Sequence, residues 1–422
     1  MGGQTTHIDA GISAGHTRTG NAVQGRPRLP LVVYVLALGT FLMLTSEFVM
    51  AGILPQIAGD LGVSVAEAGS LITVFAVGMV VGAPLMAMLT LRMSKQLTLV
   101  MALIVFAIGH VVVALGPDFT MLLVARFVSA LATGAFWAVS AVVATRAAGP
   151  ALGARAVGVV GAGGALATVL GVPLGAFVAQ LVGWRGTFWA LAATAALVTV
   201  LVARLVPHEA PAHQSTSIRA ELAGVRSGRL WLALAACATT CGGVLAAYSY
   251  IAPILTNQAG VAVSQVPLVL TGFGIGSVIG TLLAGRFGDA HPGTITIITP
   301  AVTTVLLLAI SLASGSPWLT SALLVLLGLF GLSANSVLIH LAVQFARQAA
   351  TLGSALSVSA FNAGTAVGTA IAGAALASPL GTSGPALVGT GIVALTLIPV
   401  IALAMAGRRT AVKSDDGAAA AS

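Results

Sequence analysis

The stretch LVVYVLALGTFLMLTSEFVMAGIL, residues 31–54, is apolar except for Glu47 and a few hydroxyl groups. At about 1.5 Å per residue, a helix of this length spans a hydrocarbon layer roughly 30 Å thick. An ionised carboxylate inside such a layer costs about 2.5–3.5 kcal/mol by insertion scales, so we expect Glu47 to be protonated, paired or turned toward water. Of the 10 Asp and Glu residues in the chain, only Glu47 falls well inside an apolar stretch. Such a group is suited to carry a proton.

The composition of the whole chain indicates an integral membrane protein. Of its 422 residues, 58% are hydrophobic and 7% are charged, whereas about a quarter of the residues in soluble proteins are charged. The net charge of +8 is compatible with a nucleic-acid partner, but the basic residues are spread over short loops, as membrane topology requires. We therefore expect a lipid bilayer around the protein and no nucleic acid.

Windows of about 20 apolar residues predict twelve membrane-spanning helices. They cover residues 31–54, 68–90, 97–116, 119–145, 156–181, 187–206, 230–255, 265–285, 294–313, 318–343, 352–377 and 386–406. The links between them are short, except for the polar segment 207–229 after the sixth helix. The sequence thus predicts an all-α membrane protein whose twelve helices divide into two groups of six.

The domain organisation and orientation follow from the same pattern. The predicted parts are a disordered N-terminal extension at 1–28, a six-helix bundle at 29–206, a linker at 207–229, a second six-helix bundle at 230–406 and a tail at 407–422. If the N-terminus is cytoplasmic, sixteen of the 18 Lys and Arg residues fall on the cytoplasmic side, Arg185 falls outside and Arg126 lies within a span. This bias places both termini, and the linker, in the cytoplasm.

Two spacings suggest that the halves are parallel repeats. Gly82 and Arg92 are ten positions apart at the end of the second span, and the same pair of residue types recurs at an offset of 194. The stretch GVPLG at 171–175 has a Gly-rich counterpart, GTAVG, at an offset of 193. Parallel repeats of this kind enclose a binding cavity between the two halves.

Glu47 and Arg126 are the two charged residues predicted at membrane depth. Each lies about seven residues from the predicted outer end of its span, so the two side chains are expected at one level of the bundle. Two interpretations remain open. Glu47 is a proton site whose affinity Arg126 sets, or the two residues form a static ion pair that orients their helices.

The other buried titratable groups are His110, His340, Cys237 and Cys241. A histidine relays protons near neutral pH, but it also serves as a neutral hydrogen-bonding group between helices. Both interpretations stay open for His110 and His340. The two cysteines are spaced as i and i+4 on one helix face, and we expect core thiols rather than ligands of a metal or a redox pair.

The fifth span is crowded with small residues around Gly171, Pro173 and Gly175. Glycine permits close helix approach and proline removes a backbone hydrogen bond, so the segment is predicted to serve helix packing, gating or both.

A cavity for a small organic ligand needs apolar and aromatic walls with a few polar anchors. The candidates for such a lining are Phe41, Met50, Trp137, Tyr250, Asn335 and Asn362. There is no phosphate-binding GxxxxGK[ST] loop, no HExxH metal motif and no GxSxG serine motif in the chain. We therefore expect neither an enzyme nor a cofactor or metal.

Three stretches together resemble the major facilitator superfamily, and within it the twelve-span drug/proton antiporters. They are GAPLMAMLTLRMSKQ at 82–96, LLVARFVSALATGAFWA at 122–138 and LGVPLGA at 170–176. The resemblance covers about residues 29–407 and implies a proton-coupling role for Arg126. The first stretch is similar to the gating loop of the family, with Gly82 and Arg92 in place but Leu91 where the family has Asp. Its second-half counterpart GRFGD keeps Arg286 and Asp289.

Longer phrases, among them TSEFVMAGILPQIAGDLGVSVAEAG and FGIGSVIGTLLAGRFGD, look like the actinobacterial chloramphenicol-resistance exporters. They occur less tightly in exporters of sugars and purine nucleosides. The resemblance implies a monomeric antiporter of the cytoplasmic membrane that exports chloramphenicol or a similar small antibiotic and is driven by the proton gradient. The alternatives are an exporter of sugars or nucleosides and, in another class, a membrane enzyme or assembly subunit without transport.

Overall fold

The computed structural model describes residues 29–89, 93–149, 152–208, 227–288, 290–313, 315–346 and 350–419. Within these ranges the chain is helical and contains no strand. The predicted extension at 1–28 and most of the predicted linker at 207–229 lie outside the described residues.

The first half of the chain contains seven long helical segments and one π-helical turn. They are α1 (Leu31–Leu61), α2 (Val65–Leu89), α3 (Lys95–Leu115), α4 (Phe119–Ala148), α5 (Gly153–Leu166), η2 (Ala167–Gly171), α6 (Val172–Val182) and α7 (Trp184–Leu205). The second half is interrupted at other places, namely after α9 and between α13 and α14. Its elements are α9 (Gly228–Ser249), α10 (Ile251–Pro253), η3 (Ile254–Gln258), η4 (Val263–Gln265), α11 (Val266–Gly288), α12 (Pro292–Leu312), α13 (Pro317–Gly331), α14 (Ser333–Phe345), α15 (Ala350–Leu376), η6 (Gly381–Ser383) and α16 (Gly384–Ala419).

Twelve helical spans of the described chain are long and apolar enough to cross a membrane, which confirms the predicted fold class. Most boundaries agree within a few residues. The fifth span consists of α5, η2 and α6, because Pro173 removes one backbone donor and the π-helical turn before it shifts the hydrogen-bond register. The tenth span is divided at Leu332, whose backbone leaves the helical region (φ −103°, ψ 0°).

The end of the first span was predicted wrongly. Helix α1 continues through Pro55 and has 31 residues. It ends at Gly62, which adopts the left-handed conformation (φ 66°) and donates its backbone N–H to the carbonyl of Ala58. Glu47 therefore lies near the middle of a long helix and not close to its end.

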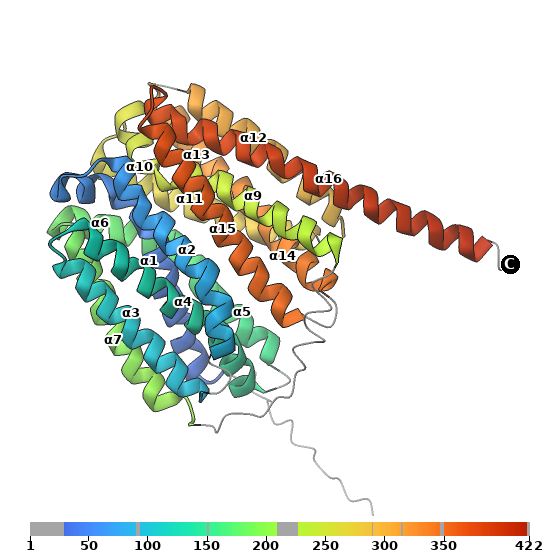
Figure 1. Ribbon diagram of the computed structural model, residues 1–422, viewed down its shortest axis with the longest axis horizontal. Coiled ribbons are helices and arrows are strands. Elements are labelled where there is room, and N and C mark those ends of the chain that lie inside the picture. The colour runs from blue at the N-terminus through green and yellow to red at the C-terminus, as the bar shows by residue number, and fades with distance from the viewer. Residues whose placement is uncertain are drawn as a thin grey trace, which may run out of the picture.

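The helices of each half form a bundle, and the two bundles lie side by side (Figure 1, blue to green and yellow-green to red). Across the boundary, α2 packs along α15, and η2 and α6 pack against α11. We call the end where α7 finishes and α9 begins the linker end. The opposite end is the one where α1 meets α2 and α6 meets α7.

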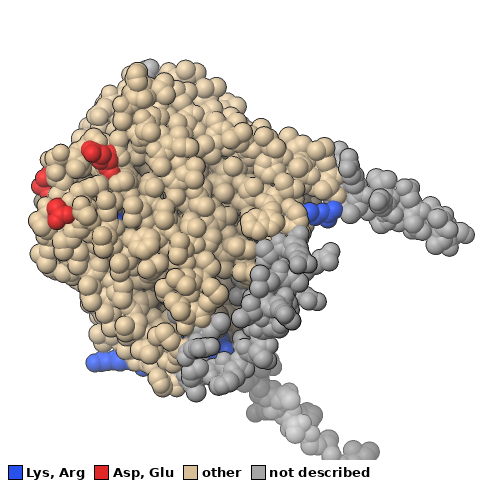
Figure 2. Space-filling model, viewed as in Figure 1, with Lys and Arg blue, Asp and Glu red and all other residues tan. Residues whose placement is uncertain are grey.

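On the face seen in Figure 2, the described surface between the two ends is almost entirely uncharged. Large apolar side chains are exposed there, such as Leu282 at 69% and Val305 at 66%. Figure 2 shows acidic groups gathered at one end and basic groups toward the other. At the acidic, opposite end, Arg185 forms an ion pair with Asp60. A wide uncharged surface between charged ends is what a lipid bilayer requires.

At the opposite end, Tyr250 seals the boundary between the halves. Its hydroxyl donates to the backbone carbonyl of Thr369 on α15 (3.2 Å), and its side chain is 1% exposed. The ring occupies space that a Cβ atom at Gly69 on α2 or Gly373 on α15 would fill. Both glycines thus permit this close contact, because any larger residue would collide with the tyrosine.

The Tyr250 bond lies within the second half, whereas two other hydrogen bonds join the two halves. The Gln180 side chain donates to the carbonyl of Val263 (2.8 Å). Nearer the middle of the bundle, the Ser359 hydroxyl donates to the carbonyl of Val80 (3.2 Å). The two halves are therefore in contact from the opposite end to the middle of the bundle, along α2 and α15 and along α6 and α11.

Candidate functional site

A cavity of about 200 Å³ lies between the two halves. The first half contributes Leu44, Glu47, Phe48, Met79 and Trp137, and the second half contributes Ile339, Ser357, Val358, Phe361 and Asn362. Among these lining residues Glu47 is the only charged one. The cavity is thus an apolar and aromatic space with one carboxyl group and two neutral polar side chains.

The helical period explains which side chains of α1 reach this region. Leu44, Glu47, Phe48 and Ala51 are spaced as i, i+3, i+4 and i+7, so they form one stripe along the helix. All four border an internal space between the halves. The residues that α15 contributes are spaced similarly, so one face of each helix is turned toward the boundary.

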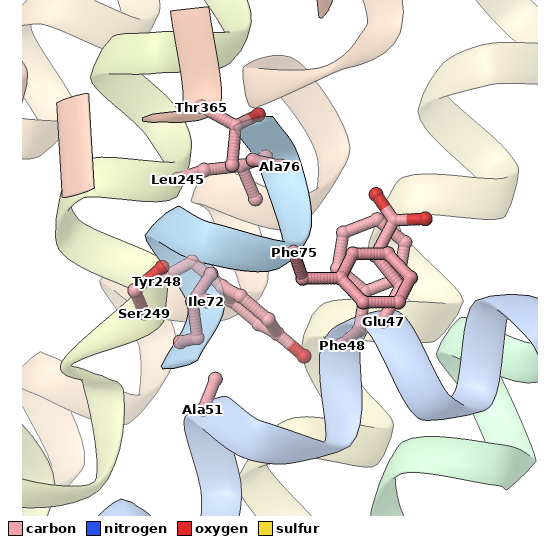
Figure 3. A pocket seen from close by; sticks show the side chains of 10 residues that line it. All are labelled: Glu47, Phe48, Ala51, Ile72, Phe75, Ala76, Leu245, Tyr248, Ser249 and Thr365. Carbon is pink, nitrogen blue, oxygen red and sulfur yellow. The ribbon is translucent and has the colours of Figure 1, made fainter. Parts of the chain in front are cut away.

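A second, much smaller space of about 10 Å³ lies on another side of Glu47, which is room for about one water molecule. Figure 3 shows its walls, in which the Glu47 side chain of α1 lies beside Phe48 and the Phe75 ring of α2. Tyr248 of α9 and Thr365 of α15 close the other side. Glu47 is half-buried between the two spaces and makes no hydrogen bond with any described residue.

Arg126 lies near Glu47 but is held by a different residue. Its side chain is 1% exposed, and its Nη1 donates to the carbonyl and the hydroxyl of Ser46 (3.1 and 3.0 Å). The guanidinium carbon lies 4.2 Å from the centre of the Phe75 ring. No ion pair joins Arg126 to Glu47 among the described residues, although the two charges interact electrostatically. The structure therefore does not show the static ion pair that was one of the two predicted interpretations.

The two predicted relay histidines lie in different surroundings. His110 is 1% exposed, and its Nε2 is 2.7 Å from the Ser46 hydroxyl, so it belongs to the same polar group as Arg126. His340 is exposed on α14, where its Nε2 accepts a hydrogen bond from Gln344 (2.8 Å). The structure thus brings His110, and not His340, into contact with the polar group beside Glu47.

Of the predicted cavity residues, Trp137 and Asn362 line the larger cavity. Phe41 lies on the same face of α1, two turns closer to its start, and does not border the cavity. Met50 is in the core with 1% exposure, because it falls outside the stripe that contains Glu47.

Two further predicted cavity residues are bound elsewhere. Tyr250 belongs to the seal described above. The Asn335 side chain accepts a hydrogen bond from the thiol of Cys237 (2.8 Å). Cys237 and Cys241 are buried free thiols, as expected for core residues.

The three glycines among the predicted gating and packing residues lie at close helix contacts. A Cβ atom at Gly171 would collide with the Thr45 hydroxyl, and one at Gly175 would collide with Val49, so both permit the fifth span to approach α1. Gly82 permits a similar approach of α2 to Leu131 of α4. Pro173 is at the start of α6, and Arg286 is exposed in the last turn of α11. Arg92 and Asp289 lie outside the described residues.

Sequence reasoning missed Ser46, although it directly precedes Glu47. A buried serine beside a buried carboxylate gives no distinctive sequence pattern, and its importance appears only when α3 and α4 are placed against α1. Leu44 and Phe48 were also missed. Their spacing from Glu47 would have identified them once the cavity face of α1 was known.

Comparisons with known proteins agree with this architecture. Residues 36–260 and 234–421 match the sequence profile of the Major Facilitator Superfamily. The chloramphenicol resistance protein of Streptomyces lividans is 33% identical over 373 residues, which cover 88% of this chain and 95% of that protein. The putative transporter AraJ of Escherichia coli (strain K12) is 33% identical over 340 residues, which cover 80% of this chain and 86% of that protein.

Solved structures show the same fold at lower identity. A bacterial homologue of the human lysosomal transporter Spinster, in an inward-facing and occupied conformation, superposes with a TM-score of 0.71 at 17% identity, covering 89% of this chain and 96% of that chain. A fold of twelve membrane-spanning helices with a cavity between two six-helix halves, and a profile that matches most of the chain, lead to one conclusion. The chain belongs to the Major Facilitator Superfamily of transporters.

Proposed function

We propose that this protein is a proton-coupled antiporter that exports chloramphenicol or a similar small antibiotic across the cytoplasmic membrane. The observation that carries the proposal is the position of Glu47: among the residues that the structure describes, this half-buried carboxyl group has no partner and is the only charged one around the cavity between the halves. The chloramphenicol resistance protein among the relatives supports the choice of substrate.

In this proposal a proton that enters from outside binds Glu47, and the two halves rock so that the cavity opens to the cytoplasm. The drug then takes up a position in the cavity as the proton leaves, and the reverse movement carries the drug out. The proton gradient alone drives this cycle, without a cofactor. The transporter acts as a monomer in the bilayer, with both termini in the cytoplasm.

The cavity wall favours an aromatic ligand such as the antibiotic over a sugar. Phe48, Trp137 and Phe361 offer aromatic surface, whereas Ser357, Asn362 and the indole N–H of Trp137 are the neutral polar groups among the described side chains around the cavity. A sugar would leave many of its hydroxyl groups without partners here, and each unpartnered group costs binding energy. Typical pockets for drug-sized ligands measure roughly 300–1,000 Å³, so the cavity of about 200 Å³ is expected to widen when the drug binds.

The direct test is chloramphenicol accumulation in cells that express the protein, compared with cells that carry an empty vector. We expect lower accumulation in the expressing cells and a return to the vector level when a protonophore collapses the gradient. Labelled purine nucleoside and sugar, measured in parallel, should accumulate equally in both strains. Drug accumulation at the vector level without the protonophore would contradict the substrate assignment.

Asn362 is expected to recognise a hydroxyl group of the drug. Its side chain is 2% exposed in the cavity wall, its Nδ2 donates to the carbonyl of Val358 (3.0 Å), and its Oδ1 has no hydrogen-bond partner. A ligand hydroxyl that reaches this buried oxygen when the cavity widens would satisfy it. Since one neutral hydrogen bond contributes about 0.5–1.5 kcal/mol, Asn362→Leu should raise the half-saturating concentration about two- to tenfold.

Two drugs that differ at one hydroxyl group distinguish loss of this hydrogen bond from a change in the shape of the cavity wall. Florfenicol differs from thiamphenicol by a fluorine atom in place of the primary hydroxyl. If the hydrogen bond is to that hydroxyl, Asn362→Leu should weaken transport of thiamphenicol and leave transport of florfenicol unchanged. If Asn362→Leu weakens transport of both drugs equally, Asn362 does not form a hydrogen bond with this hydroxyl. The measurement is the concentration dependence of initial export rates in membrane vesicles.

A further inference from the structure

Three buried polar side chains from three helices form a continuous hydrogen-bonded chain beside Glu47. On α3, His110 Nδ1 is 2.7 Å from the backbone carbonyl of Phe106 and His110 Nε2 is 2.7 Å from the hydroxyl of Ser46 on α1. On α4, Arg126 Nη1 is 3.0 Å from the same hydroxyl. The exposed fractions of His110, Ser46 and Arg126 are 1%, 0% and 1%.

The chemistry of its two ends determines the direction of every hydrogen bond in this chain. A carbonyl oxygen only accepts, so His110 Nδ1 carries the hydrogen, and Nε2 of the neutral ring is the acceptor. The Ser46 hydroxyl therefore donates to Nε2. The guanidinium only donates, so the Ser46 oxygen receives the hydrogen of Arg126 on its free lone pair. No group in the chain can reverse its role without losing a partner.

The surroundings of His110 favour this arrangement. The Phe106 ring lies 3.9 Å from the imidazole centre and the Phe188 ring lies 5.8 Å from it. An additional positive charge between these apolar rings and next to the guanidinium would have no counter-charge in contact, which is costly in a buried site. The proton relay that the sequence left open for His110 is thus disfavoured, and a neutral acceptor is favoured.

The chain has a consequence for Arg126. A buried serine in a helix otherwise turns its hydroxyl back to a carbonyl of its own helix, whereas His110 holds it toward α3 and α4. The guanidinium is then anchored at Ser46, one residue before Glu47, while its Nε and Nη2 have no hydrogen-bond partner. An anchor at this place keeps the positive charge close to Glu47 and prevents it from settling on the carboxylate.

We propose that His110 is a positioning residue for proton coupling: by accepting the Ser46 hydroxyl, it makes Ser46 the anchor that holds Arg126 beside, but unpaired with, Glu47. This inference rests on the proposed function, because it assumes that Glu47 carries the transported proton. Neither His110 nor Ser46 touches the drug or the proton in this role. Their effect passes through Arg126.

The test compares two replacements of equal length at position 110 in purified protein reconstituted into liposomes. Glutamine places an acceptor oxygen near the position of Nε2, whereas methionine fills the same space without a comparable acceptor. The measured quantity is the proton movement that an added chloramphenicol gradient drives. Ser46→Ala leaves Arg126 with only the Ser46 carbonyl as acceptor, and His110→Met frees the Ser46 hydroxyl to turn back to its own helix. For both variants we expect the maximal rate to fall about tenfold, the size of one hydrogen bond to a charged group.

We expect three further results for these variants. The half-saturating drug concentration should stay within about twofold of the wild type, because the cavity wall is unchanged. His110→Gln should recover most of the rate. The double variant Ser46→Ala with His110→Met should be no slower than the slower single variant, because both changes act on the same hydrogen bond, the one from Arg126 to the Ser46 hydroxyl. If glutamine and methionine have equal effects, His110 acts only by filling space and the inference is wrong.

Nitrogen NMR of the histidine-labelled protein at neutral pH checks the hydrogen-bond direction without any transport. We expect His110, assigned by the signals missing in His110→Gln, to carry its hydrogen on Nδ1 and none on Nε2. A hydrogen on Nε2 in the wild type overturns the inference. If wild-type protein moves no protons with the drug, the proposed function fails and the inference falls with it. If the wild type is coupled and all variants match it, only the inference fails.

Discussion

Replacing Glu47 with glutamine is expected to abolish uphill drug export. Glutamine has the same length and keeps a polar group in the stripe of α1 that borders both internal spaces, but it cannot bind and release a proton. Without a titrating group at this position the movement of the halves is no longer linked to the proton gradient. No other described residue that lines the cavity is charged, so none of them can replace Glu47.

The size of the drug gradient that Glu47→Gln is expected to abolish follows from the membrane potential that drives proton entry. One elementary charge that moves through 100 mV gains about 2.3 kcal/mol, and about 1.4 kcal/mol corresponds to a tenfold ratio. Exchange of one proton for one neutral drug molecule therefore sustains a drug gradient of about fiftyfold at 100 mV. We expect vesicles with the wild type to build a gradient of this order and vesicles with Glu47→Gln to build none.

A matched control is Glu67→Gln. Glu67 lies at the start of α2, where its carboxylate accepts hydrogen bonds from the backbone N–H and the hydroxyl of Ser64 (both 2.8 Å), and it borders neither cavity. This variant should export like the wild type. Equal amounts of folded protein in the membrane must be confirmed for all three proteins. Protonophore-sensitive export by Glu47→Gln would contradict the proposed role of Glu47.

The largest effect on stability is expected for Gly364→Ala. A Cβ atom at Gly364 on α15 would collide with the backbone carbonyl of Ala238 on α9, and neighbouring glycines on the two helices make similar contacts. Because backbone atoms cannot rotate away as a side chain does, the helices must separate. Overpacking typically costs about 1–3 kcal/mol, and a contact between two backbones is expected at the upper end of this range.

The control is the same substitution at Gly391. This residue is in α16, and a Cβ atom there would meet no other atom within 4 Å. Alanine is the better helix former by about 0.5–1 kcal/mol, so Gly391→Ala should melt at the same temperature as the wild type or slightly above it. Thermal unfolding of the purified variants in detergent measures both. If Gly364→Ala melts like Gly391→Ala, the close contact of α9 and α15 is not present in the protein.

The sequence by itself determined the fold class and most helix boundaries. Membrane spans can be read locally, because each one needs about 20 consecutive apolar residues whatever its neighbours are. Glu47 and Arg126 could be singled out for the same reason, since a charge inside an apolar run is conspicuous wherever it lies. The end of α1 was misjudged because Pro55 looked like a stop, while the actual stop depends on the left-handed backbone of Gly62.

Only the tertiary structure decided what these residues contact. Whether a side chain of an apolar helix faces lipid, core or cavity depends on the rotation of that helix, and nearly uniform hydrophobicity leaves no signal for it. Met50 and Tyr250 thus proved to be buried in the core and in the seal, and Trp137 and Asn362 to line the cavity. The partner of Arg126 is Ser46 and not Glu47, because α1, α3 and α4 meet at an angle that no sequence spacing records.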